Sequence, residues 1–386
     1  MKVLMIVTSP ELGGTETHVL YLARELMRRG VQVGVATAGG PFAPYFADAN
    51  LAVHAVSCLE KDRMEKSASK IETLVQAYGY DIVHVHDSES LALLPLLKQR
   101  MPTLGLVMTV HGKYVSASAV KRSHAVADRI LAVSPALLNW VHEIGAAPGK
   151  ALWVPNGIDT ETFSPVARSK PFRRAIHVPE SGLVGLYVGR FQSDKIAIAQ
   201  TCIEAAERVA KRRLAFTMLL IGFGDYRRRL QRKARQANER LRREAIIVRE
   251  ATLNIAPFYQ ASSFVIGTGR VALEAMACAK PVIATGYAGY DGIVTESELP
   301  RLLAGNFGDH GAKAHLHASR LATDMQTLLH SPIYRRSLGA IGRRVVVEQF
   351  SIERSATLTL AAYREVVTQK SDLLVRQEKE GGEDGD

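Results

Sequence analysis

The segment from Ile266 to Gly286, IGTGRVALEAMACAKPVIATG, restricts the fold more than any other part of the chain. It begins at the end of a short apolar strand, Ser263 to Ile266, and continues through a glycine turn and a short helix into a second apolar strand, Pro281 to Ala284. This order of elements is typical of an open α/β sheet with parallel strands. We therefore predict an α/β protein in which strands alternate with helices.

The glycine turn in this segment predicts a binding site for an anion. Gly267 and Gly269 let the backbone approach a ligand closely. Thr268, Gly269 and Arg270 lie where the start of a helix leaves amide N–H groups unpaired. One turn later, Glu274 has the acceptor geometry to hold a ribose diol if it faces the ligand. The alternative is a tight turn followed by a solvated glutamate.

The first forty residues predict a second unit of the same kind. Lys2 to Thr8 forms an apolar strand, Gly13 and Gly14 precede a helix that ends at Gly30, and Val31 to Thr37 forms the next strand. The paired glycines thus lie at the carboxyl end of a strand, where open sheets bind ligands. The G-x-G-x-x-G pattern of nicotinamide dehydrogenases does not follow this strand, which argues against that class of enzyme.

The length of 386 residues is too great for one ordinary core and suits two domains. Residues 164–182 have scattered prolines, serines and basic residues without a clear period, which is typical of a linker. We predict a first domain at 1–165, a second at 166–350, a last helix at 351–370 and a disordered acidic tail at 371–386.

The composition excludes several classes of protein. The three cysteines form no CxxC pair and have no zinc-like spacing, so neither a disulfide framework nor a structural metal is predicted, and a reducing cytoplasm is the expected setting. The chain begins with a run of apolar residues that is too short for a signal peptide and suits a first strand. No apolar run reaches the roughly 18 residues of a membrane-spanning helix.

The positive charge of the chain is concentrated in its second half. The formal net charge is +11, and basic and acidic residues balance through Pro165. The segment Arg227 to Arg243 is rich in arginine and lysine, holds the single acid Glu239 and has a helical composition. Three interpretations remain open, namely an anionic membrane surface, nucleic acid, or a solvated helix face beside a cleft for anionic substrates. No nucleic-acid-binding motif accompanies this segment, and we predict no nucleic-acid partner.

Two predicted strands carry histidines at their ends. In the first, Asp81 to His86, His84 and His86 point to the same face because side chains alternate along a strand. A metal site would need a third ligand, and only Asp87 is near in sequence, so we predict no metal. The second strand, Leu106 to Val110, leads directly into His111.

Two cations follow the first strand of the second domain, Leu183 to Val188. Arg190 lies just beyond this strand, and Lys195 lies five residues further on. At that spacing the guanidinium fork and the ammonium group can converge on a diphosphate.

Taken together, these motifs resemble those of the retaining GT-B glycosyltransferases of family four, which build surface polysaccharides and glycolipids. Glu274-Ala-Met-Ala and Lys280-Pro-Val-Ile-Ala match the second half of the family's Glu-x7-Glu signature. Ile266 stands at the position of its first glutamate, which contacts hydroxyls of the donor sugar. The resemblance continues, in the family's order, in four further motifs: Gly13-Gly14, Thr-Val-His111-Gly, Pro-Asn-Gly-Ile-Asp159, and Gly-Arg190 with Lys195. The glycine that usually follows the lysine is Ile196 here.

The resemblance implies two Rossmann-like parallel-sheet domains that face each other across a cleft, with the last helix packed on the first domain. It implies transfer of a sugar from a UDP- or GDP-type nucleotide sugar to a hydroxyl of a glycan or lipid-linked acceptor, with retention of configuration and without a metal or other cofactor. The implied catalytic residues are His111, Arg190 and Lys195, and the implied acceptor-side residue is His86. The implied donor-binding residues are Gly13, Gly14, Arg190, Lys195, Thr268, Gly269, Arg270 and Glu274.

Two other functions on the same architecture stay open. Ile266 motivates a relative that binds nucleotide sugars without catalysing transfer. A sugar-nucleotide epimerase would be expected to offer carboxylate acid/base candidates, whereas this chain mainly offers Glu274 in a ribose role. For any of these functions we expect a cytoplasmic protein, with contact to the inner face of the membrane as an open alternative.

Overall fold

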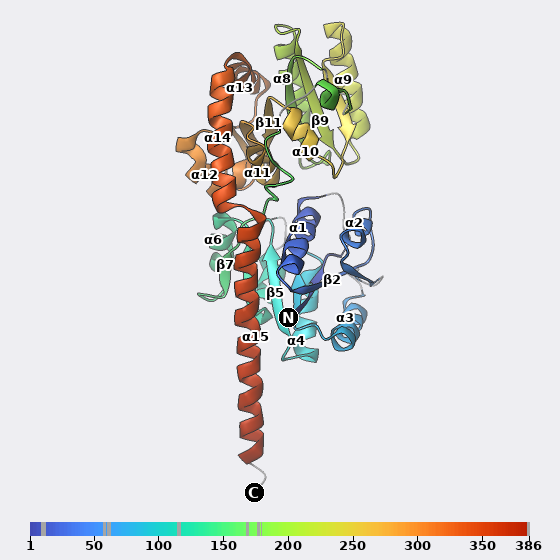
Figure 1. Cartoon of the computed structure of the whole chain (residues 1–386), viewed down its shortest axis with the longest axis vertical. Helices are drawn as coiled ribbons and strands as arrows, with labels where there is room; N and C mark the ends of the chain where they lie inside the picture. Colours follow the sequence, from blue (N-terminus) through green and yellow to red (C-terminus); the bar gives the residue numbers. More distant parts are fainter. Residues whose placement is uncertain are drawn as a thin grey trace. The chain divides into compact units, whose positions relative to one another are not determined.

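The computed structural model describes residues 1–8, 13–56, 59, 63–113, 117–166, 170–175, 178 and 180–383, without the side chains of 170–172 and 373–383. The chain divides into two compact units, each built around its own sheet (Figure 1). The first unit comprises Met1–Gly157 with Ile352–Asp386, and the second comprises Ile158–Ser351. No helix in the described part of the chain combines the length and apolarity needed to cross a membrane.

The first unit contains a seven-stranded parallel sheet with strand order β3-β2-β1-β4-β5-β6-β7. Its strands are β1 (Lys2–Ile6), β2 (Gln32–Thr37), β3 (Ala52–Ala55), β4 (Ile82–Val85), β5 (Gly105–Val110), β6 (Arg129–Ala132) and β7 (Ala151–Trp153). Its helices are α1 (Gly14–Arg28), α2 (Ala43–Asp48), α3 (Met64–Tyr78), the short η2 (Ser90–Ala92), α4 (Leu93–Arg100), α5 (Ala117–Val126), α6 (Pro135–Glu143) and α15 (Ile352–Glu383).

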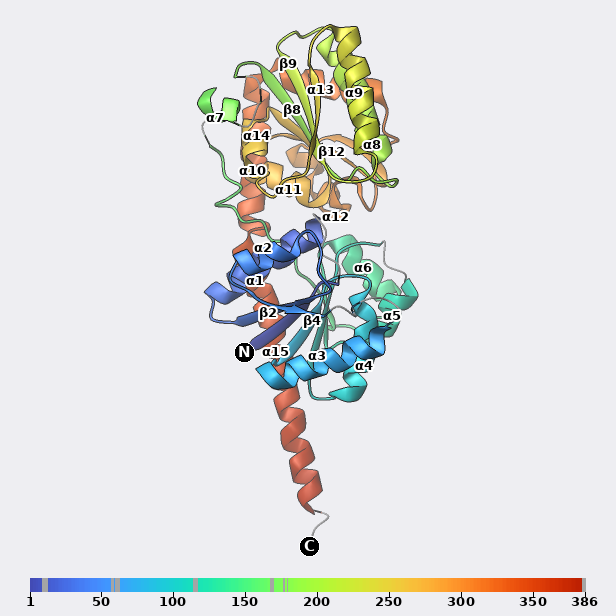
Figure 2. The same cartoon turned by 90° about the vertical axis from the view of Figure 1, so that its right-hand side faces the viewer.

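Helices cover both faces of the first sheet, which explains why β1, β4 and β5 are almost continuously apolar. One face packs on α3 and α4 in a core that includes Leu4, Val83 and Leu94. The helices α1 and α15 pack on each other, and α15 also contacts β5 (Figure 2). The predicted strand-helix-strand unit of the first forty residues is confirmed by β1, α1 and β2.

The second unit contains a six-stranded sheet with order β10-β9-β8-β11-β12-β13, parallel except for β13. Its strands are β8 (Leu183–Val188), β9 (Phe216–Gly222), β10 (Ile246–Glu250), β11 (Phe264–Gly267), β12 (Val282–Gly286) and β13 (Gly289–Ile293). Its helices are α7 (Lys170–Ala175), α8 (Ile196–Ala210), α9 (Arg227–Leu241), α10 (Ala256–Ala261), α11 (Gly269–Ala277), η3 (Glu296–Glu298), α12 (Leu299–Ala304), η4 (Asn306–Gly308), α13 (Ala318–His330) and α14 (Pro332–Gln349). The predicted α/β fold with two parallel-sheet domains is confirmed.

The boundary between the units lies between Gly157 and Ile158, before the predicted domain end at 165. The reason is packing inside the second unit. Phe163 is buried with its ring centroid 5.9 Å from that of Tyr259, and the guanidinium of Arg343 donates to the carbonyl of Phe163 at 2.8 Å. Through these contacts the segment after Gly157 packs with the second unit.

Within the predicted linker at 164–182, Lys170–Ala175 form a helix, α7. Within α7, the buried Arg173 donates to the backbone carbonyls of Gly182 at 3.1 Å and Ala261 at 3.2 Å. An arginine that satisfies two carbonyls in this way anchors the helix to the second unit.

The structure differs from the predicted start of a disordered tail at residue 371, because α15 continues to Glu383. Residues 384–386 lie outside the described part of the chain. The sequence LLVRQEKE at 373–380 is composed mainly of good helix formers. It extends a helix that is already nucleated, and adding a residue to an existing helix costs much less than starting one.

Candidate functional site

The predicted site residues lie where the strand order of each sheet reverses. In the first unit this point lies between β1 and β4, and in the second between β8 and β11. Open α/β sheets bind their ligands outside the carboxyl ends of the strands at such a switch point. His86 follows β4, Arg190 follows β8, and Thr268 follows β11. The topology therefore supports the placement of the predicted sites in each unit.

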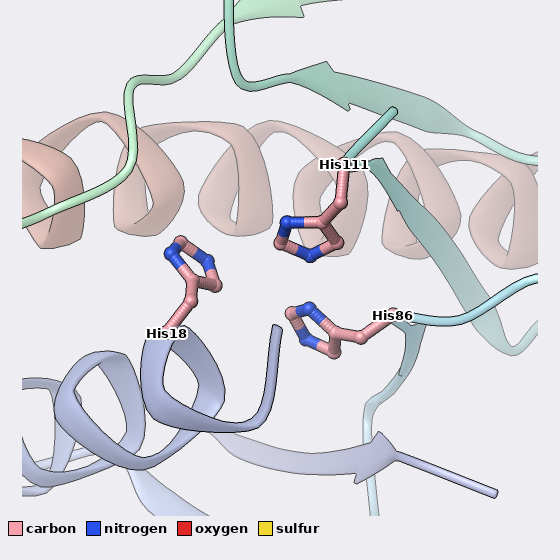
Figure 3. A group of neighbouring side chains, drawn as sticks. All are labelled: His18, His86 and His111. Atoms are coloured by element: carbon pink, nitrogen blue, oxygen red, sulfur yellow. The ribbon is translucent and has the colours of Figure 1, made fainter. Parts of the chain in front are cut away.

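Three histidines converge at the carboxyl edge of the first sheet (Figure 3). His18 comes from the first turns of α1, His86 from the end of β4 and His111 from the end of β5. The ring centroid of His111 lies 5.0 Å from that of His18 and 5.8 Å from that of His86. One ring nitrogen of each histidine lies within 4.8 Å of the other two. His18 and His86 are buried, whereas His111 is partly exposed.

His18 was not among the residues predicted for a site. A signal was available, because His18 follows Gly14 by four residues, which is one turn into the predicted helix. A residue at that spacing faces the same way as the glycine loop and therefore the same edge of the sheet. The pattern of a glycine pair followed by a histidine one turn later would have found it.

The surroundings of His86 favour its neutral imidazole form. Burial lowers the pKa of His86 well below its usual range, and the neighbouring His84, His111 and His18 shift it further in the same direction. Both of its ring nitrogens are buried, and neither has a hydrogen-bond partner among the residues that the structure describes. A buried polar atom without a partner costs about 1–3 kcal/mol, so His86 favours any ligand that can bind either nitrogen.

His84 shares the face of His86, as the alternation along the strand predicted, and their ring centroids are 3.9 Å apart. Its nitrogens are already used: Nδ1 lies 2.5 Å from the hydroxyl of Tyr363 and Nε2 lies 2.7 Å from that of Thr109. Burial, aided by His111, lowers the pKa of His84 to about 3. His84 thus packs against Tyr363 of α15, and its two nitrogens are not available to the cluster of His18, His86 and His111.

Asp87, the only neighbour in sequence considered as a third metal ligand, has a structural role instead. Its carboxylate accepts the backbone N–H of Thr8 and, at 2.7 Å, that of Ser90. These bonds connect β1 to the turn after β4. The residues that come together with His86 are distant in sequence, which is why local spacing did not reveal them.

Gly13 and Gly14 form the start of α1, with Gly13 as its N-cap. A Cβ atom added to Gly13 would lie 2.5 Å from Oε2 of Glu16, so the glycine provides room for that carboxylate. Residues 9–12 of the same loop lie outside the described part of the chain. The contact of this loop with a diphosphate stays a prediction.

The two predicted diphosphate ligands of the second unit are both paired with carboxylates. Arg190 Nη2 lies 2.7 Å from Asp194 Oδ2, and Lys195 Nζ lies 3.2 Å from Asp309 Oδ1. The side chain of Arg190 is 49% exposed and that of Lys195 is 15% exposed. An anion that approaches this edge of the sheet therefore competes with two carboxylates for the cations.

A strained segment, Asn306–Gly308, borders the turn after β11. Its three residues have positive φ angles of 51°, 55° and 96°. Left-handed backbone at the non-glycine residues Asn306 and Phe307 costs on the order of 1 kcal/mol each and is often found at functional sites. Thr268 Oγ1 donates to the carbonyl of Asn306 at 2.9 Å. The segment was not predicted, since its sequence resembles an ordinary turn.

Glu274 is held inside the second unit. Its carboxylate accepts the Nε–H of Arg270 at 2.8 Å and the hydroxyl of Tyr259 at 2.9 Å, and the residue is 6% exposed. Burial raises the pKa of Glu274, while Arg270 and Tyr259 act in the opposite direction. The pairing with these two side chains was not foreseen from the sequence. Contact of Glu274 with a ribose stays a prediction.

Ile266 lies in the hydrophobic core of the second unit and not on a surface that could meet a ligand. It belongs to β11, is fully buried, and lies between Tyr187 on β8 and Ile283 on β12. In this structure the position has a packing role.

Comparisons with known proteins agree with these features. Residues 12–162 match the family model described as Glycosyltransferase Family 4, and residues 182–318 match the model described as Glycosyl transferases group 1. The phosphatidyl-myo-inositol mannosyltransferase of Mycobacterium tuberculosis (strain ATCC 25618 / H37Rv) is 25% identical over 354 residues, which cover 86% of this chain and 88% of that protein. The D-inositol 3-phosphate glycosyltransferase of Kribbella flavida is 28% identical over 412 residues, a match that covers 92% of this chain and 91% of that protein.

Solved structures share the fold over almost the whole chain. A glycosyltransferase from Rickettsia africae has a TM-score of 0.76 at 18% identity and covers 95% of this chain and 98% of its own. HepE from Anabaena, in complex with UDP, has a TM-score of 0.72 at 17% identity, and the match covers 96% of this chain and 100% of HepE. The UDP-GlcNAc 2-epimerase of Neisseria meningitidis has a TM-score of 0.67 at 11% identity, and the match covers 95% of this chain and 100% of the epimerase.

Proposed function

The chain belongs to the group 1 glycosyltransferases, and from this membership we propose that Arg190 and Lys195 bind the diphosphate of its donor. The protein is a retaining glycosyltransferase of the GT-B fold class that moves a sugar from a nucleotide sugar to a hydroxyl group. The observation that supports the proposal is the position of both cations beyond β8, at the switch point of the second sheet. The backbone N–H groups at the start of α11, beginning at Thr268, complete the proposed diphosphate site.

The proposed mechanism rests on charge. As the bond between the sugar and the diphosphate breaks, the leaving group gains negative charge, and cations already in position stabilise that charge. Arg190 and Lys195 exchange Asp194 and Asp309 for phosphate oxygens when the donor binds. Ion pairs that are partly exposed contribute only about 0–1 kcal/mol, so this exchange costs little. In the first unit, His111 donates a hydrogen bond to the leaving phosphate, His86 lines the acceptor side, and Gly13 and Gly14 lie against the diphosphate.

We propose further that the donor carries UDP or GDP and that transfer needs no metal ion, because the two cations and the helix N-termini supply the positive charge. The test is incubation of the full chain with a panel of UDP- and GDP-sugars, with and without a chelator, followed by measurement of the free nucleoside diphosphate. Release from one class of donor, undiminished by the chelator, is the expected result. A folded protein that binds nucleotide but releases none, even when glycan and lipid-linked acceptors are added, would contradict transfer and favour a binding-only relative. A changed sugar still attached to its nucleotide would instead indicate an epimerase.

We propose a glycan or lipid-linked acceptor and a membrane contact through α9. The relative from Mycobacterium tuberculosis is named for a lipid acceptor. Arg228, Arg232 and Arg235 are exposed along one side of α9, opposite the buried Leu230 and Ala234. Residues at this spacing lie on one face of a helix. Each arginine near an anionic membrane surface contributes about 1 kcal/mol of attraction.

Sedimentation with vesicles tests the membrane contact. The chain should bind vesicles that contain phosphatidylglycerol at low salt and should not bind pure phosphatidylcholine. Replacing Arg228 and Arg232 by serine should weaken binding about tenfold or more, on the scale of roughly 1 kcal/mol per charge. Replacing the exposed Lys66 and Lys70 of α3 is the matched control and should have little effect. Equal losses in the two double variants would show that only net charge matters.

A further inference from the structure

The cluster of His18, His86 and His111 has the composition of a metal site. Each histidine offers one ring nitrogen to a common centre, and these nitrogens lie within 4.8 Å of one another (Figure 3). The three residues come from α1 and from the ends of β4 and β5, elements that the parallel sheet holds together. We propose that these three histidines bind one divalent transition-metal ion of the zinc class, and that the bound ion inhibits the enzyme.

The three histidine nitrogens need to move only slightly closer together to bind one metal ion. In a tetrahedral zinc site the metal lies about 2.0–2.1 Å from each imidazole nitrogen, which places the nitrogens about 3.4 Å apart. Each nitrogen would therefore move by less than about 1 Å, a shift that rotation of the side chains supplies. His111 is partly exposed, so the cluster is not sealed inside the first unit, and an ion held by three histidines keeps a fourth position for an exchangeable ligand.

The ligand set decides which ions fit. The group contains imidazoles alone, and imidazole suits zinc, copper, nickel and cobalt, whereas magnesium, calcium and manganese prefer carboxylates and water. The buried ring of His86 is the second observation in favour of a ligand, since neither of its nitrogens has a hydrogen-bond partner in the described part of the chain. Because no described residue accepts a hydrogen bond from its ring and so orients it, we expect weaker binding than at a structural zinc site.

His84 does not belong to the site, although it lies beside His86. Its two nitrogens bind the hydroxyls of Tyr363 and Thr109. The proposed set is therefore limited to three protein ligands, the number found in zinc sites that keep a position open for an exchangeable ligand.

Inhibition would follow from the position of His111. If the metal ion takes the ring nitrogen of His111 that faces the leaving phosphate, the imidazole proton resides on the other nitrogen, and the hydrogen bond that the proposed mechanism assigns to the phosphate cannot form. This half of the inference rests on the proposed function, whereas binding of the ion does not. The two halves can therefore be measured separately.

The binding experiment uses the full chain without a polyhistidine tag, stripped with a chelator and dialysed. Calorimetry with Zn²⁺ and absorption spectroscopy with Co²⁺ should each show one ion per chain, and Mg²⁺ should show none. His18→Gln should weaken Zn²⁺ binding at least tenfold. His142→Gln removes an exposed histidine of α6 and is the matched control, which should bind as the wild type does. Thermal unfolding checks that both variants fold.

Three binding results would overturn the proposal: no binding of Zn²⁺, Zn²⁺ binding unchanged in His18→Gln, or equal binding of Mg²⁺. The inhibition experiment then measures sugar transfer at rising Zn²⁺, with reversal by a chelator. Inhibition should require at least tenfold more Zn²⁺ in His18→Gln than in the wild type. Binding without inhibition would overturn the second half alone. Absence of transfer under all conditions would contradict the proposed function and leave the binding result intact.

Discussion

The ammonium group of Lys195 lies 3.2 Å from Oδ1 of Asp309, and the same oxygen accepts the backbone N–H of Tyr287 at 3.1 Å. Asp309 directly follows the strained segment Asn306–Gly308, which accepts a hydrogen bond from Thr268. Lys195 at the start of α8 and the turn after β11 are thus connected through one short segment. A change at Asp309 is expected to alter both sides of the proposed diphosphate site.

Asp309→Asn should tighten the binding of free UDP or GDP by up to about fivefold. The substitution removes a negative charge beside the proposed phosphate position, and a partly exposed charge interaction of this kind is worth up to about 1 kcal/mol. Asparagine keeps an oxygen that can accept the N–H of Tyr287, so the local fold should persist. Calorimetry with the free diphosphate measures the change. Weaker binding would mean that Asp309 orients Lys195 and does not compete with the ligand.

Arg190→Ala and Lys195→Ala should each lower turnover by about one to three orders of magnitude. A charge-assisted contact is worth about 1.5–3 kcal/mol, more if it strengthens in the transition state, and roughly 1.4 kcal/mol corresponds to a tenfold change in rate. Arg212→Ala removes an exposed cation of the same unit and is the control. Steady-state kinetics with the identified donor provide the measurement. Full activity of either variant, with the fold intact, would refute its assignment.

Glu274→Gln should destabilise the second unit as well as weaken nucleotide binding. The substitution leaves the guanidinium of Arg270 buried without its carboxylate, and breaking a buried ion pair costs about 3–5 kcal/mol. Tyr259→Phe keeps the ion pair, loses one hydrogen bond and should cost about 1 kcal/mol or somewhat more. Urea unfolding compares the stability of the wild type, Glu274→Gln and Tyr259→Phe.

The ribose contact of Glu274 is tested by calorimetry with free UDP or GDP, at temperatures where all three proteins are folded. Unchanged affinity in Glu274→Gln would restrict Glu274 to a structural role.

Ile266→Glu should unfold the second unit and should not restore a family contact. The substitution places a carboxylate in a fully buried strand, and burying an unpaired charge costs several kcal/mol. Ile266→Val keeps the position apolar and should cost about 0.5–1.5 kcal/mol. Thermal unfolding distinguishes the two outcomes. A melting temperature near that of the wild type in Ile266→Glu would show that this side chain can turn out of the core.

Glu207→Gln should reduce stability at neutral pH and much less at acid pH. The pKa of Glu207 is lowered to about 2, chiefly because Arg240 on α9 donates hydrogen bonds to its carboxylate. Burial acts in the opposite direction and raises this pKa, whereas Lys211 lowers it further. A lowered carboxyl pKa contributes stability above about pH 4.5 that is lost as the pH falls toward 2. For a partly exposed pair the contribution is about 0.5–1 kcal/mol. Urea unfolding at pH 7 and pH 3 should show the difference shrinking, and Arg240→Gln should behave in the same way.

The sequence was sufficient for the architecture because buried parallel strands are nearly continuous apolar runs. Strands such as β8 and β11, and the glycines at their ends, could therefore be located without a structure. The positions of Arg190 and Thr268 followed from the same rule, since ligands bind at the carboxyl ends of such strands. The basic segment was likewise recognised as a helix, α9.

The remaining features depend on contacts between residues distant in sequence. His18 joins His86 and His111 because the fold brings α1 to the ends of β4 and β5; the local spacing from Gly14 places His18 at that edge of the sheet but does not identify its partners. The left-handed backbone of Phe307 is not a preference of phenylalanine, so the segment must be held by its surroundings. The pairing of Glu274 with Tyr259 likewise depends on how α10 packs against α11. Tertiary packing decides these details.

The division of the chain also sets an order of assembly during translation. The second unit is one uninterrupted segment, whereas the first needs α15 from the end of the chain. On the ribosome, residues 158–351 can complete their sheet while the first unit still lacks Tyr363, the partner of His84, and Val366, which packs near Gly105. A nonsense codon shortly after residue 351 would therefore leave the later-made unit whole and the earlier-made one unfinished. Helix α15 thus packs on a sheet whose strands all precede the second unit in the chain.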